Sequence, residues 1–363
     1  MSIRSSLPCY GLAAVVLVSA RLGAQHAPSR AGIHGEIIDS VHLRKLGGAQ
    51  VMAIRLAPEP AEFFSTTTDA SGRFHFDTLT PGHYSVVFTS AFLDSLDLLL
   101  PPHDVVLGGG EEAHVDMGTP SGARLRDAAC PGLALPLGKG AVIGEVYDAD
   151  TESPIAGARV AVGWTDISFD QSAMRVRLTP RIGAVVTDSL GQYRLCGVPT
   201  NQRLMVQVQT PQAAGAEIEL FVDDQAGILR RMLSLSATES RSIADTAVVP
   251  PDVRRSRPLT GGAQLSGTIR TQDGHPLAGA QLRVMDAPST AVTDSAGHFV
   301  LSNLPAGSQV AEARKLGYTA GRAPVELRRG RTAELELRLT RFVSLDSVRV
   351  LARRTRYRAM GLR

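Results

Sequence analysis

Aromatic residues, cysteines and long apolar runs are all scarce in this sequence. Its 363 residues include one Trp, six Tyr, ten Phe and three Cys, and its formal net charge is only +3. The longest apolar run, from Gly11 to Ala20, is half of the roughly 20 residues that a membrane-spanning helix needs. The weak net charge is not typical of a nucleic-acid-binding protein. We therefore expect no nucleic-acid partner, and no transmembrane segment in the mature chain.

Local catalytic motifs are also missing. None of the nine His residues has Glu three positions later, and neither His-Glu-x-x-His nor Gly-x-Ser-x-Gly occurs. Asp148, Asp150 and Glu152 alternate as calcium ligands can, but Ser153 stands where a calcium-binding loop of the EF-hand type needs Gly. We expect a solvated turn there. The sequence predicts no enzyme, no cofactor and no metal site.

The first 24 residues resemble a secretory signal peptide. Arg4 precedes the apolar run, and Leu22-Gly23-Ala24 supplies a small-residue cleavage site before Gln25. We expect an exported protein that is periplasmic, associated with the outer membrane or secreted. Cleavage leaves Cys130 and Cys196 as the one possible intramolecular pair. A disulfide between them is predicted, and two unrelated thiols remain the alternative.

One motif occurs three times and predicts three hairpin turns. In each copy Thr-Asp-x-x-Gly is followed, after one intervening residue, by an aromatic residue: Phe74, Tyr193 or Phe299. The Asp carboxylate can accept hydrogen bonds from backbone amides ahead of it, and the Gly can adopt positive φ, so the chain reverses between two strands. The turn residues are Asp69 and Gly72, Asp188 and Gly191, and Asp294 and Gly297.

Alternating polarity predicts strands and little helix. The clearest case is Ala333 to Leu339, where apolar side chains alternate with Glu and Arg over seven residues. The 35 Gly and 21 Pro favour many short strands joined by turns. The fold class is therefore all-β. The spacing of the repeat predicts a signal peptide at 1–24, domains at 25–118, 128–235 and 263–340, linkers at 119–127 and 236–262, and a basic tail at 341–363.

The repeats resemble carboxypeptidase regulatory-like domains. The third carries the motifs in order: Leu277-Ala278-Gly279-Ala280, Thr293-Asp294-Ser295-Ala296-Gly297-His298-Phe299 and Leu304-Pro305-Ala306-Gly307. The first repeat is more divergent. The resemblance implies tandem transthyretin-like β-sandwiches of about seven strands, which occur as accessory modules of exported proteins.

The tail after the third repeat resembles the segment that precedes the plug of TonB-dependent outer-membrane receptors. The residues that this resemblance nominates for contact with TonB are Leu345, Asp346, Val348 and Val350. It implies strand addition to a sheet edge of TonB. The alternative is an ordinary terminal strand with a basic end, because the tail holds seven Arg and one Asp.

Sugar binding is a third possibility, since related sandwich modules include starch binders. Trp164 and Phe169, on the long insertion of the second repeat, are the aromatic residues that we nominate as ligand contacts. The sequence as a whole predicts an exported, non-enzymatic cell-envelope protein that binds or spaces its partners. We expect the partner to be an envelope protein or a glycan. The alternatives are a shortened or separated N-terminal extension of a TonB-dependent receptor, with TonB as partner, and a carbohydrate-binding module.

Overall fold

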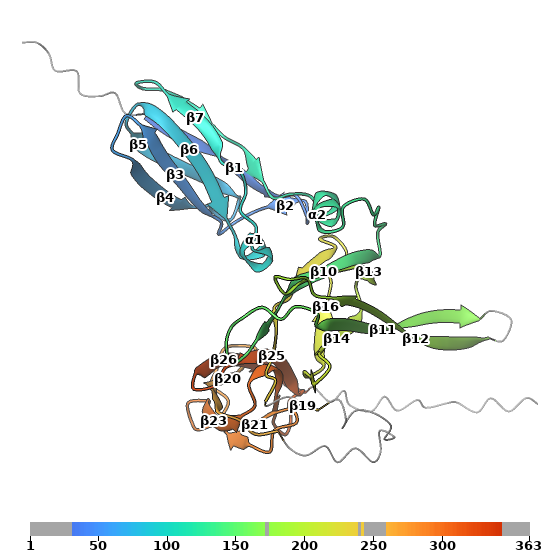
Figure 1. Ribbon diagram of the computed structural model, residues 1–363. Helices are drawn as coiled ribbons and strands as arrows, with labels where there is room; N and C mark the ends of the chain where they lie inside the picture. Colours follow the sequence, from blue (N-terminus) through green and yellow to red (C-terminus); the bar gives the residue numbers. More distant parts are fainter. Residues whose placement is uncertain (1–30, 171–173, 239–240, 243–258, 343–363) are drawn as a thin grey trace, which may run out of the picture. The chain divides into compact units, whose positions relative to one another are not determined.

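The computed structural model describes residues 31–170, 174–238, 241–242 and 259–342. The regular secondary structure of these residues is almost all strand, as the sequence predicts, with two short helices (Figure 1). The chain divides into two compact units, of which the first holds most residues up to Gly118 and the second holds Thr119 onward. Three separate hydrophobic cores lie within them, one in the first unit and two in the second. We call the three structures around these cores the first, second and third sandwich.

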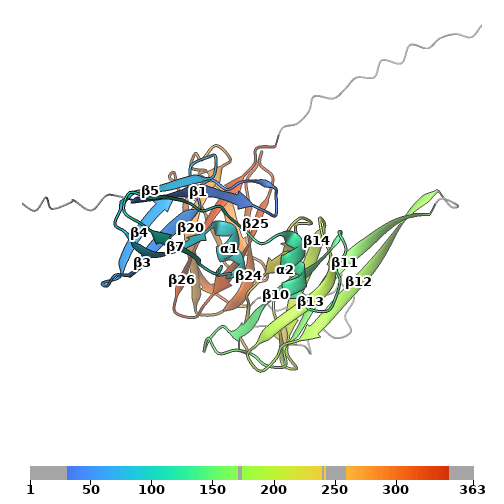
Figure 2. The ribbon, with the colours of Figure 1, turned by 90° about the horizontal axis from the view of Figure 1, so that it is seen from above.

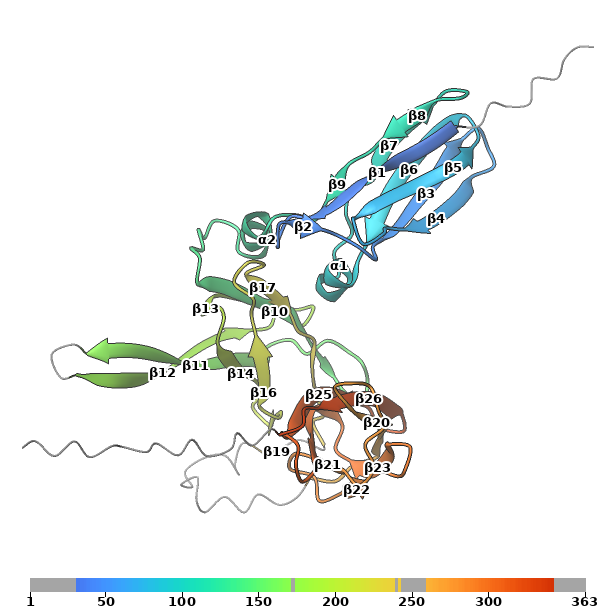
Figure 3. The same cartoon turned by 180° about the vertical axis from the view of Figure 1, so that it is seen from behind.

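The first sandwich has two sheets that face each other across a core. Its elements are β1 (Ala31–Asp39), β2 (Arg44–Lys45), β3 (Gln50–Ala57), β4 (Glu62–Thr67), β5 (Arg73–Leu79), β6 (Gly82–Thr89), α1 (Ala91–Leu96), β7 (His103–Leu107), β8 (Glu112–His114) and β9 (Met117–Gly118). One sheet has the order β2-β1-β5 with β8 and β9 also on β1, and the other has the order β4-β3-β6-β7. Figure 3 shows β8 and β9 beside β1. Phe74 and Phe76 point into the core while Arg73 and His75 are exposed, as the alternation of β5 requires.

The second unit contains the remaining strands. Those of the second sandwich, with one helix, are α2 (Gly122–Ala129), β10 (Lys139–Asp148), β11 (Arg159–Asp170), β12 (Arg175–Val186), β13 (Gln192–Pro199), β14 (Arg203–Gln209), β15 (Ala213–Ala214), β16 (Ile218–Phe221), β17 (Ile228–Arg230), β18 (Leu233–Leu235) and β19 (Arg241–Ser242). Those of the third are β20 (Ala263–Thr271), β21 (Gln281–Val284), β22 (Thr290–Val292), β23 (His298–Leu304), β24 (Gly307–Arg314), β25 (Gly321–Leu327) and β26 (Thr332–Leu339).

All three sandwiches share one pairing plan. The first strand of each (β1, β10, β20) pairs antiparallel with the strand after the repeated turn (β5, β13, β23). On its other side it pairs parallel with the last strands of the sandwich. The opposite sheet is built on β3, β11 or β21, each paired with a hairpin partner and with a returning strand. The second sandwich thus repeats the architecture of the other two.

The second and third sandwiches share a sheet. Leu235 of β18 pairs with Gly307 of β24, which joins the two into one eight-stranded sheet. Its order is β13-β10-β18-β24-β21-β22, with β17 also on β10 and β25 also on β24. Gly307 has φ of +110°, a backbone conformation that an L side chain rarely adopts, and its position lies close to backbone atoms of residues 234 to 236. A glycine there allows the two backbones to meet.

One predicted linker contains a helix in the structure. The segment 119–127 lies largely in helix α2, which begins after the N-cap Ser121 and ends before the C-cap Cys130. The Gly and Pro content of this region suggested a connection without secondary structure, but the helix is anchored by capping and by its C-terminal cysteine. Much of the predicted linker 236–262 lies outside the described residues, as do the predicted signal peptide and nearly all of the predicted basic tail.

Candidate functional site

The three repeated turns have one geometry. In the first, Oδ1 of Asp69 accepts hydrogen bonds from the amides of Ser71 (2.8 Å) and Arg73 (2.9 Å). The same oxygen of Asp188 and of Asp294 bonds the equivalent amides two and four residues ahead. Gly72, Gly191 and Gly297 have φ between +72° and +79°. The structure therefore contains hairpin turns at these Asp and Gly residues, with the hydrogen bonds and the positive φ that their sequence predicts.

The structure adds a residue that we did not nominate, the Thr before each turn Asp. The hydroxyl of Thr187 accepts from the amide of Ala158 (2.9 Å) and donates to the carbonyl of Ile155 (2.6 Å). Thr68 and Thr293 make the same two bonds with their own repeats, and all three residues are buried. Each Thr thus satisfies two backbone groups of the bend before the second core strand. The signal was present in the sequence, because Thr precedes Asp in all three copies.

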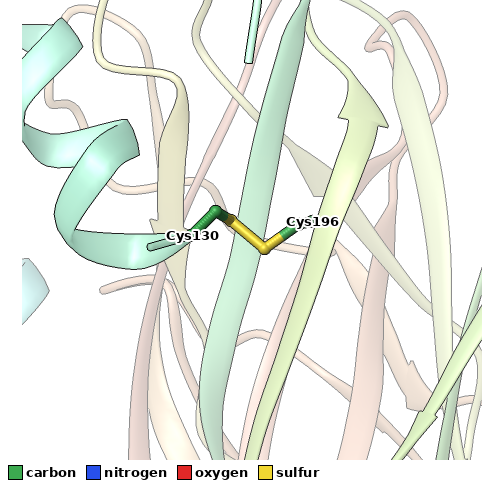
Figure 4. The surroundings of a disulfide bond; sticks show 2 residues. All are labelled: Cys130 and Cys196. Atoms are coloured by element: carbon green, nitrogen blue, oxygen red, sulfur yellow. A yellow bond between two sulfur atoms is a disulfide. The ribbon is translucent and has the colours of Figure 1, made fainter. Parts of the chain in front are cut away.

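The predicted disulfide is present. Cys130 and Cys196 are bonded, with their Cα atoms 6.2 Å apart (Figure 4). Cys130 caps α2 and is buried, and Cys196 lies in β13. The bond closes a loop of 66 residues and holds the helix against the sheet of the second sandwich. The disulfide thus fixes the end of helix α2 to strand β13.

A cluster of polar side chains, here called the Glu326 cluster, joins the second and third sandwiches beside β18 and β24. Oε2 of Glu326 accepts from the hydroxyls of Ser234 and Ser308, both at 2.6 Å. Ser308 in turn accepts from the amide of Ser234 at 2.7 Å. Oε1 of Glu326 accepts from Arg231 at 2.8 Å. Ser234 and Ser308 are each 2% exposed, so these polar groups depend on one another for partners.

Ion pairs extend the contact between these sandwiches. Glu152 pairs with Arg328 (2.7 Å) and Arg331 (3.2 Å), and Asp150 pairs with Arg329 (3.3 Å). Arg328 also lies 5.6 Å from the ring centre of Tyr147, a cation–π arrangement. Burial and the Glu326 carboxylate raise the pKa of Tyr147. The acidic turn that we expected to be solvated thus faces arginines of the third sandwich.

A second charged cluster lies on the third sandwich around Glu312. This residue is fully buried, and its carboxylate receives Arg283 (2.6 Å), Arg314 (2.9 Å) and Arg322 (2.8 Å). Arg283, Glu312 and Arg322 are paired in register across β21, β24 and β25. Burial acts to raise the pKa of Glu312, but hydrogen bonds from the three arginines outweigh it and lower the pKa to about 2. The carboxylate therefore holds three cations on this face of the sheet.

Trp164 and Phe169 lie on a long hairpin rather than on a loop. β11 and β12 form twelve cross-strand pairs, from Arg159↔Val186 to Asp170↔Arg175, but β14 accompanies β11 only from Arg159 to Gly163. Beyond Gly163 the hairpin is two-stranded and projects from the sheet (Figure 2). We call residues 159–170 and 175–186 the arm.

The structure does not bring the two nominated aromatic residues together. Trp164 is half-buried, packs against the core of the second sandwich, and its indole N–H donates to Asp166 at 3.0 Å. Phe169 is 55% exposed. Because 164 and 169 differ by an odd number, the two side chains project from opposite faces of the strand. They cannot form one stacking platform for a sugar ring.

The remaining nominated residues fall elsewhere. Leu345, Asp346, Val348 and Val350 lie outside the described residues. Among the residues that the structure describes, no three His, Cys, Asp or Glu side chains are grouped so that they could hold a metal ion. No helix in that part of the chain is long and apolar enough to cross a membrane.

Comparison with known proteins supports the family resemblance. The model of the carboxypeptidase regulatory-like domain matches residues 32–113 and 264–340, which fall in the first and third sandwiches. The motif-carrying segments Thr68 to Phe74 and Thr293 to Phe299 lie inside these matches. No relative was found among curated protein sequences.

Several solved structures show a weak likeness to this chain. The TIE protein of Bacillus anthracis is 13% identical, with a TM-score of 0.24, over 86% of this chain and 51% of that one. BcpA, the major pilin subunit of Bacillus cereus, is 12% identical with a TM-score of 0.24, over 85% and 99%. Shaft pilin SpaA of Lactobacillus rhamnosus GG is 11% identical with a TM-score of 0.21, over 56% and 97%.

These likenesses are too weak to carry an argument about function, and the chain spans about half the length of the TIE protein. The family match and the repeated turn geometry are the findings that identify its modules. The chain is a protein that carries carboxypeptidase regulatory-like domains at residues 32–113 and 264–340.

Proposed function

We propose that this chain is an exported, non-catalytic protein of the cell envelope, in which the second and third sandwiches form a rigid spacer that presents a binding arm. The observation that carries the proposal is the junction of these sandwiches. A shared sheet, the buried Glu326 cluster and three ion pairs link them. A flexible connection between modules would need none of these contacts.

Export is supported by two features. A signal-like segment precedes the first sandwich, and the bond between Cys130 and Cys196 belongs to proteins of oxidising compartments. The absence of local catalytic motifs in the sequence supports a non-catalytic role.

The spacer is tested by measuring the distance between the second and third sandwiches. Spin labels are placed at Arg194→Cys on β13 and Val300→Cys on β23, both exposed positions. Double electron–electron resonance on the full mature chain, diluted with unlabelled protein, should give one narrow distance distribution. A broad distribution would show that the two sandwiches move independently and would reject the spacer. Labels on a Glu326→Ala background provide the loosened reference.

Export is tested separately by the intact mass of the native protein in periplasmic, outer-membrane and secreted fractions. We expect the mass of a chain that starts at Gln25. This mass should be two hydrogens smaller before reduction than after it. A chain that retains residues 1–24 in the cytoplasm would contradict export.

A further inference from the structure

We propose that the arm of the second sandwich binds the arm of a second copy of this chain, face to face, in a two-fold symmetric dimer. The inference rests on the proposed function in one respect, that the arm is a binding surface. The rigid spacer is independent of it, because the spacer depends on contacts of β18, β24 and β25, and the arm depends on β11 and β12.

One face of the arm is apolar and exposed. From Val176 to Val186, every second residue of β12 is apolar, and cross-strand pairing puts Ile167 beside Leu178 and Phe169 beside Val176 on the same side. The exposed fractions of the largest side chains are Ile167 72%, Phe169 55%, Val176 60%, Leu178 63%, Ile182 72% and Val186 64%. Pro180 and Ala184 are exposed between them.

The area of this face is what a protein interface requires. Six large apolar side chains exposed by more than half, with Pro180 and Ala184, present on the order of 800 Å². A standard protein–protein interface buries about 800 Å² on each partner. The largest apolar patch of an ordinary monomer is roughly 300 to 600 Å². The arm of one copy is therefore large enough to be the whole binding surface.

The charges on the arm favour a protein sheet over an anionic lipid surface. The charged residues lie on the other face, where Arg181 pairs with Asp166 (3.0 Å) and Arg177 with Asp170 (3.6 Å). On the apolar face of the two strands the one charged residue is Arg159, at the base. A surface that binds acidic headgroups places basic side chains around its apolar part. Apart from Arg159 at its base, the apolar face of the arm carries no charge, like the inner face of a sandwich.

The distribution of side-chain size makes the face self-complementary. Along β11, Phe169 and Ile167 lie toward the far end of the arm, whereas Gly163 and Ala161 lie toward its base. When two arms run in opposite directions about a two-fold axis near Thr165, Phe169 and Ile167 of each copy meet Ala161 and Gly163 of the other. Along β12, Leu178 of each copy packs on Ile182 of the other, which adds apolar contact. Sheets that pack face to face in this way interdigitate at about 10 Å.

Pairing through the edge of β12 is the less suitable geometry. β12 is the edge strand of its sheet, but Pro180 lies in its middle and has no amide hydrogen to donate to an added strand. Proline at such a position blocks a continuous ladder. The face, which has no such interruption, is therefore the surface for the second copy.

The dimer is tested by two adjacent substitutions that introduce the same charge on opposite faces. Ile167→Glu places a carboxylate in the apolar face, and Ser168→Glu places one on the charged face beside Arg177. Both positions lie beyond the last pair with β14, so neither alters the core of the second sandwich. Sedimentation equilibrium of the mature protein at micromolar concentrations should give a dimer for the wild type and for Ser168→Glu. Ile167→Glu should weaken dimerisation at least tenfold.

The arrangement is tested by crosslinking near the axis. Thr165→Cys should form an intermolecular disulfide under mild oxidation, because the two copies of residue 165 face each other, whereas Ser168→Cys should not. Three results would each overturn the proposal: a wild type that is monomeric throughout, equal effects of the two Glu variants, or equal crosslinking of the two Cys variants. A monomer that floats with anionic vesicles through Ile167 would assign the face to lipid and would also overturn it.

Discussion

The carboxylate of Glu326, in the third sandwich, accepts a 2.6 Å hydrogen bond from the hydroxyl of Ser234, in the second. The two residues are 92 positions apart, and the same carboxylate oxygen binds Ser308. The hydroxyl of Ser308 closes the cluster by accepting from the amide of Ser234. A polar contact that is buried between two sandwiches couples their stabilities, because separating them leaves these groups unpaired or requires their rehydration.

Glu326→Ala should therefore uncouple the second and third sandwiches. We expect the wild-type unit to unfold in one calorimetric transition and the variant in two, with a loss of about 1 to 3 kcal/mol from the less stable sandwich. Differential scanning calorimetry measures both quantities. Glu336→Ala is the matched control, since Glu336 is an exposed β26 residue that pairs only locally with Arg338. Identical single transitions for both variants would contradict the coupling.

The repeated Thr gives a second prediction. Thr187→Val keeps the shape of the side chain but leaves the amide of Ala158 and the carbonyl of Ile155 without their partner. Burial of these groups should cost about 1 to 3 kcal/mol in the free energy of unfolding, measured by urea denaturation. Thr187→Ser, which retains the hydroxyl, should recover most of the loss. Thr290→Val, at an exposed position, should change stability little. A loss with Ser as large as with Val would assign the effect to packing instead.

Reduction of the disulfide gives a third prediction. Opening the 66-residue loop should lower the free energy of unfolding by about 4 kcal/mol in the chain-entropy account. Urea denaturation with and without reductant measures the difference. The double variant Cys130→Ser/Cys196→Ser should be less stable than the oxidised protein and should not respond to reductant. An equal response in the double variant would show that the reductant acts elsewhere.

The features that could be predicted from the sequence are mostly those whose interacting residues lie close together in the chain. The turns at Asp69, Asp188 and Asp294 were predicted because the Asp, the Gly and the amides they use lie within five residues. The bond between Cys130 and Cys196 was predicted because export leaves no other pair. The Thr hydroxyls were missed because their partners lie on a neighbouring bend, so the local pattern does not show what they bond.

The junction of the second and third sandwiches was beyond sequence reasoning for the same reason. Ser234, Ser308 and Glu326 are ordinary polar residues of their strands, and only the approach of β18 to β24 gives them a common role. The arm was not predicted as a hairpin, because the sequence shows this region only as a long insertion of the second repeat. Which side of β12 faces the core depends on pairing with β11, and that pairing leaves the apolar side outward.

The cluster at Glu312 predicts an acid transition in the third sandwich. In the folded protein the pKa of Glu312 is lowered from 4.5 to about 2, so the unfolded chain binds its proton first as the pH falls. The carboxylate therefore contributes its full stabilisation above about pH 4.5, loses it progressively toward pH 2, and contributes nothing below that value. The shift corresponds to about 3 kcal/mol in the free energy of unfolding.

Glu312→Gln should remove this dependence. The variant is expected to be less stable at neutral pH, because Arg283, Arg314 and Arg322 would face one another without the carboxylate, and to lose less stability than the wild type between pH 4.5 and pH 2. Urea denaturation at a series of pH values measures both slopes. Glu334→Gln, an exposed residue of β26, should leave the slope of the wild type intact. Parallel pH profiles for wild type and Glu312→Gln would show that other carboxylates cause the acid transition and that the three arginines do not hold the charge of Glu312.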